Sequence, residues 1–150
     1  MCTRFVIVVC LVSFAGMLPG EEPRPLPALA EVSLIRIGTP NGWWLSIRRN
    51  GSGSVNFGSG GGDVAAVNGR AFDFPAVYAS LAAAVHPEGN MGDSFSIAFL
   101  RSNGGATVSQ FTDRAEIVGT LFSTAKEHWL PVNKQRFDEL WNTQPPVPKK

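Results

Sequence analysis

The chain has very little cysteine. Its only two cysteines, Cys2 and Cys10, lie among the first ten of its 150 residues. If the N-terminal segment is removed during export, the remaining chain has no thiol. Disulfides, cysteine metal sites and thiol catalysis are then excluded, and the hydrophobic core alone must hold the fold. A chain of about 120–130 residues is long enough for that.

Charged residues are also scarce. They make up 17% of the chain, against roughly 25% in typical soluble domains. The two signs are balanced: Met1–Gly20 contains one charged residue, Arg4, and the rest of the chain carries twelve basic and twelve acidic residues. Phosphate binding requires a basic excess, so this balance argues against nucleic acid as the main partner.

A nucleotide-binding motif is missing as well. The glycine-rich stretch Asn50–Asp63, NGSGSVNFGSGGGD, could in isolation be a loop that cradles a phosphate. Such a loop lies between a strand and a helix, usually with a lysine after the glycines. Here no lysine follows, no helix is predicted before about Asp73, and no G-x-G-x-x-G pattern is completed. The stretch therefore predicts turns around a short strand.

Motifs for metal binding or nucleophilic catalysis are absent too. Beyond the N-terminal segment, the chain has two distant histidines, His86 and His128, and no serine in a G-x-S-x-G elbow. Both histidines fall at predicted helix ends, where an imidazolium interacts favourably with the helix dipole. We expect no cofactor, no metal site and no catalytic residue that the sequence identifies. A hydrolase with a site built from scattered polar residues is kept as an alternative.

The N-terminus has the order of a secretory signal. Arg4 precedes an apolar run, Phe5–Leu18, and small residues follow it. The run is shorter than the ~20 residues that span a bilayer. We expect residues 1–20 to be a cleaved signal peptide, so that the protein is secreted or periplasmic and has no stable membrane insertion afterwards. The alternative is an uncleaved segment that tethers the protein to a membrane.

The rest of the chain divides by composition into three parts. Residues 21–30, EEPRPLPALA, are predicted to be a proline-rich tether, because proline favours extended chain. Residues 31–142 are predicted to form a single α+β domain. Residues 143–150, TQPPVPKK, are predicted to be a disordered tail.

Within the domain, residue alternation and helical spacing predict the order β-β-β-α-β-β-α-α. Asn50-Gly51 is typical of a two-residue type I′ hairpin turn. Asp73 is expected to cap the first helix, and Asp113 with Glu116 to cap the second. Hairpins pair antiparallel, so the order predicts an antiparallel sheet of about five strands with helices packed on one face, a two-layer sandwich. The elements are expected at Glu31–Gly38, Gly42–Arg49, Ser54–Gly58, Ala71–His86, Asp93–Arg101, Ala106–Thr112, Arg114–Trp129 and Asn133–Trp141.

The adjacent tryptophans Trp43 and Trp44 provide the one candidate site. Neighbouring strand residues point to opposite sides, so Trp43 is expected in the core and Trp44 on the open face. The candidate partner-binding residues on that face are Trp44, Arg48, Arg36, Ser46 and Asn56. Tryptophan and arginine are common interface anchors, and tryptophan stacks on sugars.

These residues predict an exported, non-enzymatic module that binds a protein or a glycan. Two alternatives stay open: a small secreted hydrolase, and a structural domain that forms a homo-oligomer through the same face. Asn50-Gly51-Ser52 also matches the acceptor sequence for N-glycosylation, which is relevant only in a host that glycosylates exported proteins.

Overall fold

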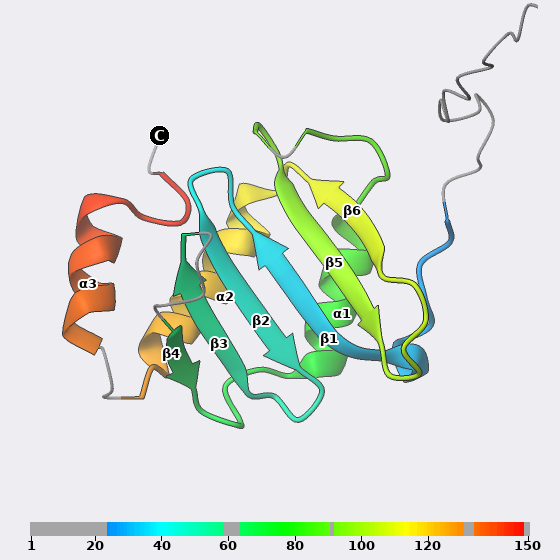
Figure 1. Ribbon diagram of the computed structural model, residues 1–150, viewed down its shortest axis with the longest axis horizontal. Helices are drawn as coiled ribbons and strands as arrows, with labels where there is room; N and C mark the ends of the chain where they lie inside the picture. Colours follow the sequence, from blue (N-terminus) through cyan, green and yellow to red (C-terminus); the bar gives the residue numbers. More distant parts are fainter. Residues whose placement is uncertain (1–23, 59–63, 91, 131–133, 149–150) are drawn as a thin grey trace, which may run out of the picture.

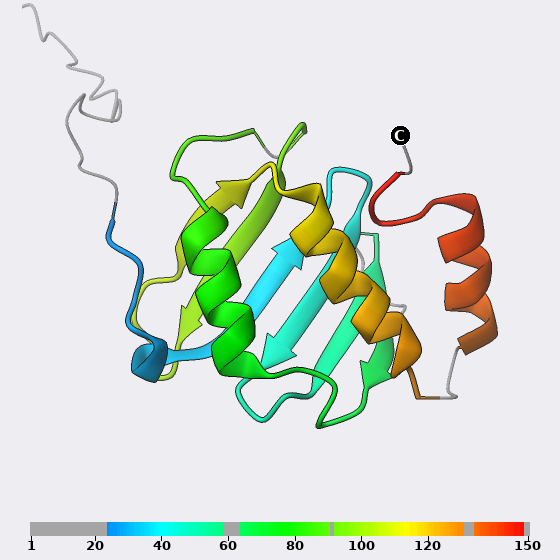
Figure 2. The same cartoon turned by 180° about the vertical axis from the view of Figure 1, so that it is seen from behind.

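The computed structural model describes residues 24–58, 64–90, 92–130 and 134–148, so the predicted signal peptide, 1–20, lies outside it. The described chain forms one six-stranded antiparallel sheet in the order β4-β3-β2-β1-β5-β6 (Figure 1). Helices α1 and α2 cross one side of this sheet (Figure 2). The predicted α+β fold and its antiparallel sheet are confirmed, with six strands in place of about five. The strands are β1 (Val32–Gly38), β2 (Trp43–Arg48), β3 (Gly53–Phe57), β4 (Val64–Val67), β5 (Phe95–Arg101) and β6 (Val108–Thr112), and the helices are α1 (Phe74–Ala84), α2 (Ala115–Glu127) and α3 (Lys134–Thr143), with a 3-10 turn at Leu29–Glu31.

Strand β4 is the element that the sequence did not predict. It pairs with β3, with Ala65 opposite Val55 and Ala66 opposite Ser54. Its four residues, VAAV, are all apolar, so they show no alternation between a core side and a solvent side. The glycine-rich stretch thus leads from one strand to another strand and not to a helix.

The first hairpin differs from the predicted two-residue turn. Arg48 N donates to Ser52 O at 2.8 Å, and Gly51 N donates to Arg48 O at 2.9 Å. These bonds enclose a three-residue loop, Arg49–Gly51, whose last residue has φ +83°. Glycine adopts this left-handed conformation at little cost, and a left-handed third residue is what such loops require.

The hydrophobic core lies between the sheet and the helices, around Trp43. The Trp43 side chain is fully buried, as parity predicted. Its ring centroid lies 5.2 Å from that of Phe57, 6.3 Å from Phe122, and 6.0 Å from both Phe137 and Trp141. Since Phe137 and Trp141 belong to α3, this aromatic cluster holds α3 against the same side of the sheet as α2. None of the described helices has the length and apolar character that a membrane span needs.

The two main helices begin differently. Asp73 is the N-cap of α1, and its Oδ1 accepts from Ala76 N at 3.2 Å, as predicted. In α2 the N-cap position is Arg114, and no side chain caps it. The predicted capping pair Asp113/Glu116 is therefore wrong. The Asp113 carboxylate instead accepts from Ser94 Oγ at 2.9 Å.

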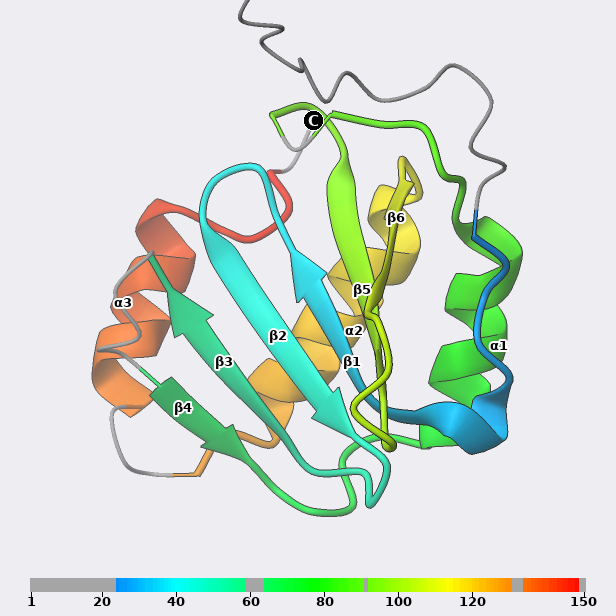
Figure 3. The same ribbon diagram turned by 45° about the vertical axis from the view of Figure 1, so that its right-hand side comes forward.

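Both terminal segments contact the domain over their described residues. In the segment predicted as a tether, Pro27 O accepts from Tyr78 Oη at 2.5 Å, so this segment runs beside α1 (Figure 3). In the segment predicted as a disordered tail, Gln144 O accepts from the Trp43 indole N–H at 2.7 Å. Pro145 O accepts from Asn41 Nδ2 at 2.8 Å.

Candidate binding face

The face of the sheet opposite the helices is open. We call it the outer face, and Figure 1 looks onto it with no described helix across it. Strand register fixes which side chains share this face, because residues paired directly across strands point the same way. One row crosses all six strands and consists of Ser109, Ala98, Arg36, Ser46, Ser54 and Ala66. The next row contains Phe111, Ser96, Gly38, Trp44 and Asn56.

Trp44 reaches over the neighbouring strand on this face. It pairs with Gly38 of β1, and Gly38 pairs on its other side with Ser96. A Cβ placed on Gly38 would come within 2.6 Å of Trp44 Cζ3 and 2.5 Å of Ser96 Oγ. The indole edge therefore occupies the space that a side chain on Gly38 would need. The Trp44 side chain is half-buried, so part of the ring stays in contact with solvent.

Two arginines stand on the outer face. Arg36 is exposed in the central strand β1, with Ser46 on one side and Ala98 on the other. Arg48 is exposed at the end of β2, opposite Leu34. Within the described part of the chain, neither guanidinium has an ion pair, and no acidic residue falls in the two rows above. The centre of the outer face is thus positively charged.

The five predicted site residues do share one face. Register places Ser46 beside Arg36 and Asn56 beside Trp44. Ser46 is only 9% exposed, so a partner would contact its larger neighbours first. Sequence reasoning missed Gly38 and Phe111. The contact between Gly38 and Trp44 depends on cross-strand register, which alternation does not give. The position of Phe111 on the outer face could not be predicted from polarity. Its polar neighbours Gln110 and Thr112 point inward and are buried, the reverse of the usual pattern.

A cluster at one end of the molecule contains the residue types of a hydrolase. His86 Nε2 lies 3.4 Å from Asp113 Oδ2, and Ser94 Oγ donates to Asp113 Oδ1. In a catalytic triad the histidine stands between the serine and the carboxylate, and here the carboxylate stands between the other two. His128, the second histidine, lies at the end of α2 with Nδ1 2.9 Å from Thr124 O. In the described residues no group of three potential metal ligands is found.

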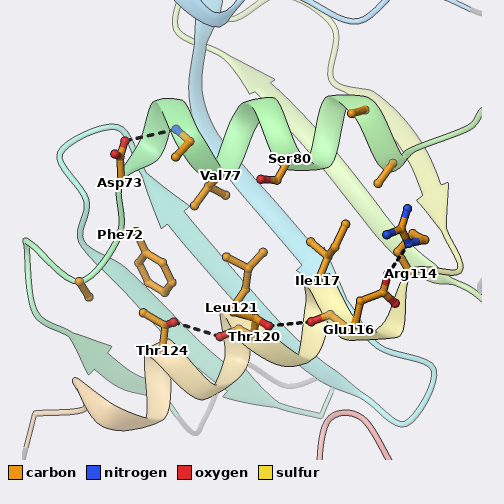
Figure 4. Close-up of a pocket in the computed structure, with 14 residues that line it drawn as sticks. Phe72, Asp73, Val77, Ser80, Arg114, Glu116, Ile117, Thr120, Leu121 and Thr124 are labelled. Atoms are coloured by element: carbon orange, nitrogen blue, oxygen red, sulfur yellow. Dashed lines mark hydrogen bonds and ion pairs between the residues drawn. The ribbon is translucent and has the colours of Figure 1, made fainter.

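A groove runs between α1 and α2 on the opposite side of the molecule (Figure 4). Its volume is about 600 Å³. Phe72, Val77, Ile117 and Leu121 supply its apolar lining, as Figure 4 shows. Polar groups border its ends: Asp73 and Thr124 at one, and Arg114 with Glu116 at the other.

The charged pair at that second end is local to α2. The Arg114 guanidinium donates to the Glu116 carboxylate, and this hydrogen bond lowers the pKa of Glu116 below its usual value of 4.5. Glu116 is therefore ionised at neutral pH, and the pair puts one positive and one negative group at this rim.

Comparison of the chain with protein-family models, with curated proteins and with solved structures finds no match. The geometry of the outer face and of the groove is therefore what supports the proposals below.

Proposed function

We propose that this protein is an exported, non-enzymatic binding module that contacts a protein or a glycan through the outer face around Trp44. The observation that carries this proposal is the pairing of a half-exposed indole, laid over Gly38, with two arginines that have no ion-pair partner among the described residues. The signal-like order of residues 1–20 supports export, and we infer that the protein acts in the periplasm or outside the cell.

The residues of the outer face suit recognition more than chemistry. A tryptophan fixed by its neighbours presents a large contact area with little conformational entropy left to lose on binding. Arg36 offers several N–H donors at the centre of a surface made of serine and alanine, so a partner can approach it closely. The side chains beside Arg36 are small and do not protrude, which fits a broad and shallow contact surface.

The charge of this face narrows the partner chemistry. Arg36 and Arg48 are unopposed by acidic groups in their rows, so a partner with carboxylates is favoured. An acidic glycan and an acidic patch on a protein both satisfy this requirement. The balanced net charge of the chain outside residues 1–20 still argues against nucleic acid.

The edges of the sheet are less suited to partner binding than its outer face. At β4, Leu130 N donates to Ala66 O at 2.9 Å, and at β6, His86 and Phe111 exchange two backbone hydrogen bonds of 2.8 and 2.9 Å. Both edges are therefore already partly paired by this chain, which disfavours recognition by addition of a peptide strand.

The test is a binding screen with matched variants. Wild-type protein expressed from the full-length chain is applied to neutral and acidic glycans and to proteins of the exported fraction. We expect Trp44→Ala and Arg36→Ala each to weaken the binding that is found by about tenfold or more, which is the usual effect of losing an anchor residue. Arg70→Ala, which removes an exposed arginine outside the rows of the outer face, is the control and should bind normally.

Two results would contradict the proposal. Binding that survives the double variant Trp44→Ala/Arg36→Ala would place the contact elsewhere. Hydrolysis of a substrate by the wild type, lost in His86→Ala, would show that the protein is an enzyme whose active site is the cluster around Asp113.

A further inference from the structure

Helix α1 has no charged residue, although half of it faces solvent. Its sequence is FPAVYASLAAA, and its inward residues Phe74, Val77 and Leu81 are buried in the core. A helix on the surface normally carries charged residues on its solvent side, and a helix that is apolar all round is normally covered on all sides. The exposed residues of α1 are Pro75, Ala76, Ala79, Ser80 and Ala83.

The other two helices follow the usual rule. Helix α2 exposes Glu116 and Glu127, and α3 exposes Lys134 and Glu139. The uncharged surface is therefore particular to α1 and to the groove beside it, whose wall is formed by Ala76, Ser80 and Ala83. The outer side of α1 and the groove form one continuous surface, on the side of the sheet away from Trp44.

We propose that a second copy of this chain covers this surface, with α1 of each copy lying antiparallel in the α1–α2 groove of the other. The twofold axis passes close to Ala79 and Ser80, the middle of α1. This arrangement is isologous: the same patch is used twice, and the assembly closes as a dimer.

Size and shape favour a helix of this kind as the occupant. Apart from Val77, the groove side of α1 carries only alanine and serine, so a second helix can approach closely along it. An eleven-residue helix is about 16 Å long, and α1 itself borders the groove over nearly its whole length, from Ala76 to Ala84. A copy of α1 therefore matches the groove in length and brings no charged residue into its apolar centre.

Charge at the two ends of the groove selects the antiparallel direction. Asp73 borders one end, and Arg114 with its ion-pair partner Glu116 borders the other (Figure 4), so a parallel copy would bring its Asp73 to a carboxylate alone. An antiparallel copy of α1 brings its own Asp73 to the end at which Arg114 lies, and the twofold axis repeats this contact. Arg114 Nε donates to Glu116, and the guanidinium has further N–H groups for a second carboxylate. Antiparallel packing also aligns the two helix dipoles favourably.

A membrane surface fits this helix less well. Helices that lie in a membrane interface carry lysine or arginine along their polar side and large apolar residues on the other. The exposed residues of α1 include neither a cation nor a large side chain other than proline. Small side chains bury little area in lipid but pack closely against another helix.

Sedimentation velocity of protein expressed from the full-length chain tests the dimer. We expect a concentration-dependent shift from monomer to twice the monomer mass. Ser80→Glu places two like charges at the twofold axis and should weaken the dimer by about tenfold or more. Asn142→Glu, on the exposed side of α3, adds the same charge outside the interface and should leave the dimer unchanged. Circular dichroism of both variants shows whether the monomer fold is retained.

A single-cysteine variant tests the position of the axis. In a Cys2→Ser/Cys10→Ser background, Ser80→Cys is nearly isosteric and provides the only thiol of the chain. Near a twofold axis the two copies of this residue come within the roughly 4.4–6.8 Å between Cα atoms that a disulfide requires. We expect a disulfide-linked dimer on mild oxidation, and no such product from Asn142→Cys in the same background.

Three results would overturn the inference. These are a wild type that stays monomeric at every concentration, a dimer that Ser80→Glu does not weaken, and a dimer in which Ser80→Cys does not cross-link. Binding of a monomeric wild type to phosphatidylglycerol vesicles, lost in Ser80→Glu, would assign the surface to lipid. Trp44→Ala should leave the dimer intact, which keeps this test separate from that of the outer face.

Discussion

Gly38 is the residue on which the position of Trp44 depends. A Cβ at Gly38 would lie 2.6 Å from Trp44 Cζ3 and 2.5 Å from Ser96 Oγ, closer than non-bonded atoms can approach. Gly38→Ala should therefore displace the indole and destabilise the fold by about 1–3 kcal/mol, as overpacking does. Equilibrium denaturation in urea measures the loss, and the same variant should weaken partner binding.

Gly119 provides the matched control. It lies inside α2, and a Cβ there would be 3.8 Å from the nearest atom, on Val147, which is an ordinary contact. Gly119→Ala should stabilise the protein by about 0.5–1 kcal/mol, because alanine loses less entropy than glycine in a helix. If the two substitutions change the free energy of unfolding in opposite directions, crowding against Trp44, and not a general property of glycine, causes the loss of stability at Gly38. A stabilising Gly38→Ala would mean that the indole does not lie over this residue.

At the scale of elements, the sequence was enough to predict those with a clear period. The alternation around Trp43 placed that residue in the core, and the cap at Asp73 with the apolar stripe of α1 located the first helix. The same alternation predicted Trp44 on the opposite side of the sheet from Trp43, and the strand register agrees. These predictions depend on local geometry, which the sequence contains.

Elements set by tertiary contacts were not predictable in the same way. Strand β4 is uniformly apolar, and it is a strand because β3 on one side and the backbone of Leu130 on the other supply hydrogen bonds. Asp113 has the residue type and spacing of an N-cap, yet Ser94 and His86 bind its carboxylate. The absence of charged residues in α1 is visible in the sequence, but only the structure shows which of its residues are exposed.

Thr112 joins the end of α1 to the start of α2. Its side chain is fully buried, donates to Ala84 O at 3.0 Å and accepts from Arg114 N at 3.1 Å. Thr112→Val keeps the shape and removes both hydrogen bonds, leaving a carbonyl and an amide without this partner. We expect a loss of about 1–3 kcal/mol in the free energy of unfolding.

Thr120→Val is the comparison for this change. Thr120 Oγ1 donates to Glu116 O at 2.8 Å, but this side chain is exposed in the monomer, so at protein concentrations that keep the chain monomeric water replaces the lost bond. The expected change is within about 0.5 kcal/mol. Equal effects of the two substitutions in thermal unfolding would show that the Thr112 link contributes nothing beyond an ordinary surface hydrogen bond.

At the scale of the whole molecule, the sheet separates two surfaces with different chemistry. The outer face is polar and positively charged at its centre, and the α1–α2 groove is apolar, with the Asp73 carboxylate at one end and the Arg114–Glu116 ion pair at the other. Because the sheet and its core lie between them, a dimer formed through the helices leaves both outer faces free. A partner with repeated binding sites could then contact both faces at once, which raises its apparent affinity without any new contact.

The C-terminal segment is hydrogen-bonded to residues near the start of the domain. The bond from the Trp43 indole to Gln144 O joins residues 101 positions apart, and that from Asn41 to Pro145 O joins residues 104 apart. Val147 packs against the core as well. Truncation after Thr143 removes both acceptors and leaves the N–H of a fully buried tryptophan without this acceptor. We expect a destabilisation of about 2–4 kcal/mol, from the unpaired donor and the lost apolar contacts.

The point variant Gln144→Ala separates the backbone from the side chain in this contact. The acceptor is the main-chain carbonyl of Gln144, which alanine also has, and the side chain is exposed. The substitution should therefore leave the free energy of unfolding within about 0.5 kcal/mol of wild type, while the truncation lowers it. The Trp43 indole N–H should also exchange slowly with deuterium in the wild type and in Gln144→Ala, and faster in the truncated chain. A truncated protein with wild-type stability and slow exchange at Trp43 would mean that the segment is not held against the domain in solution.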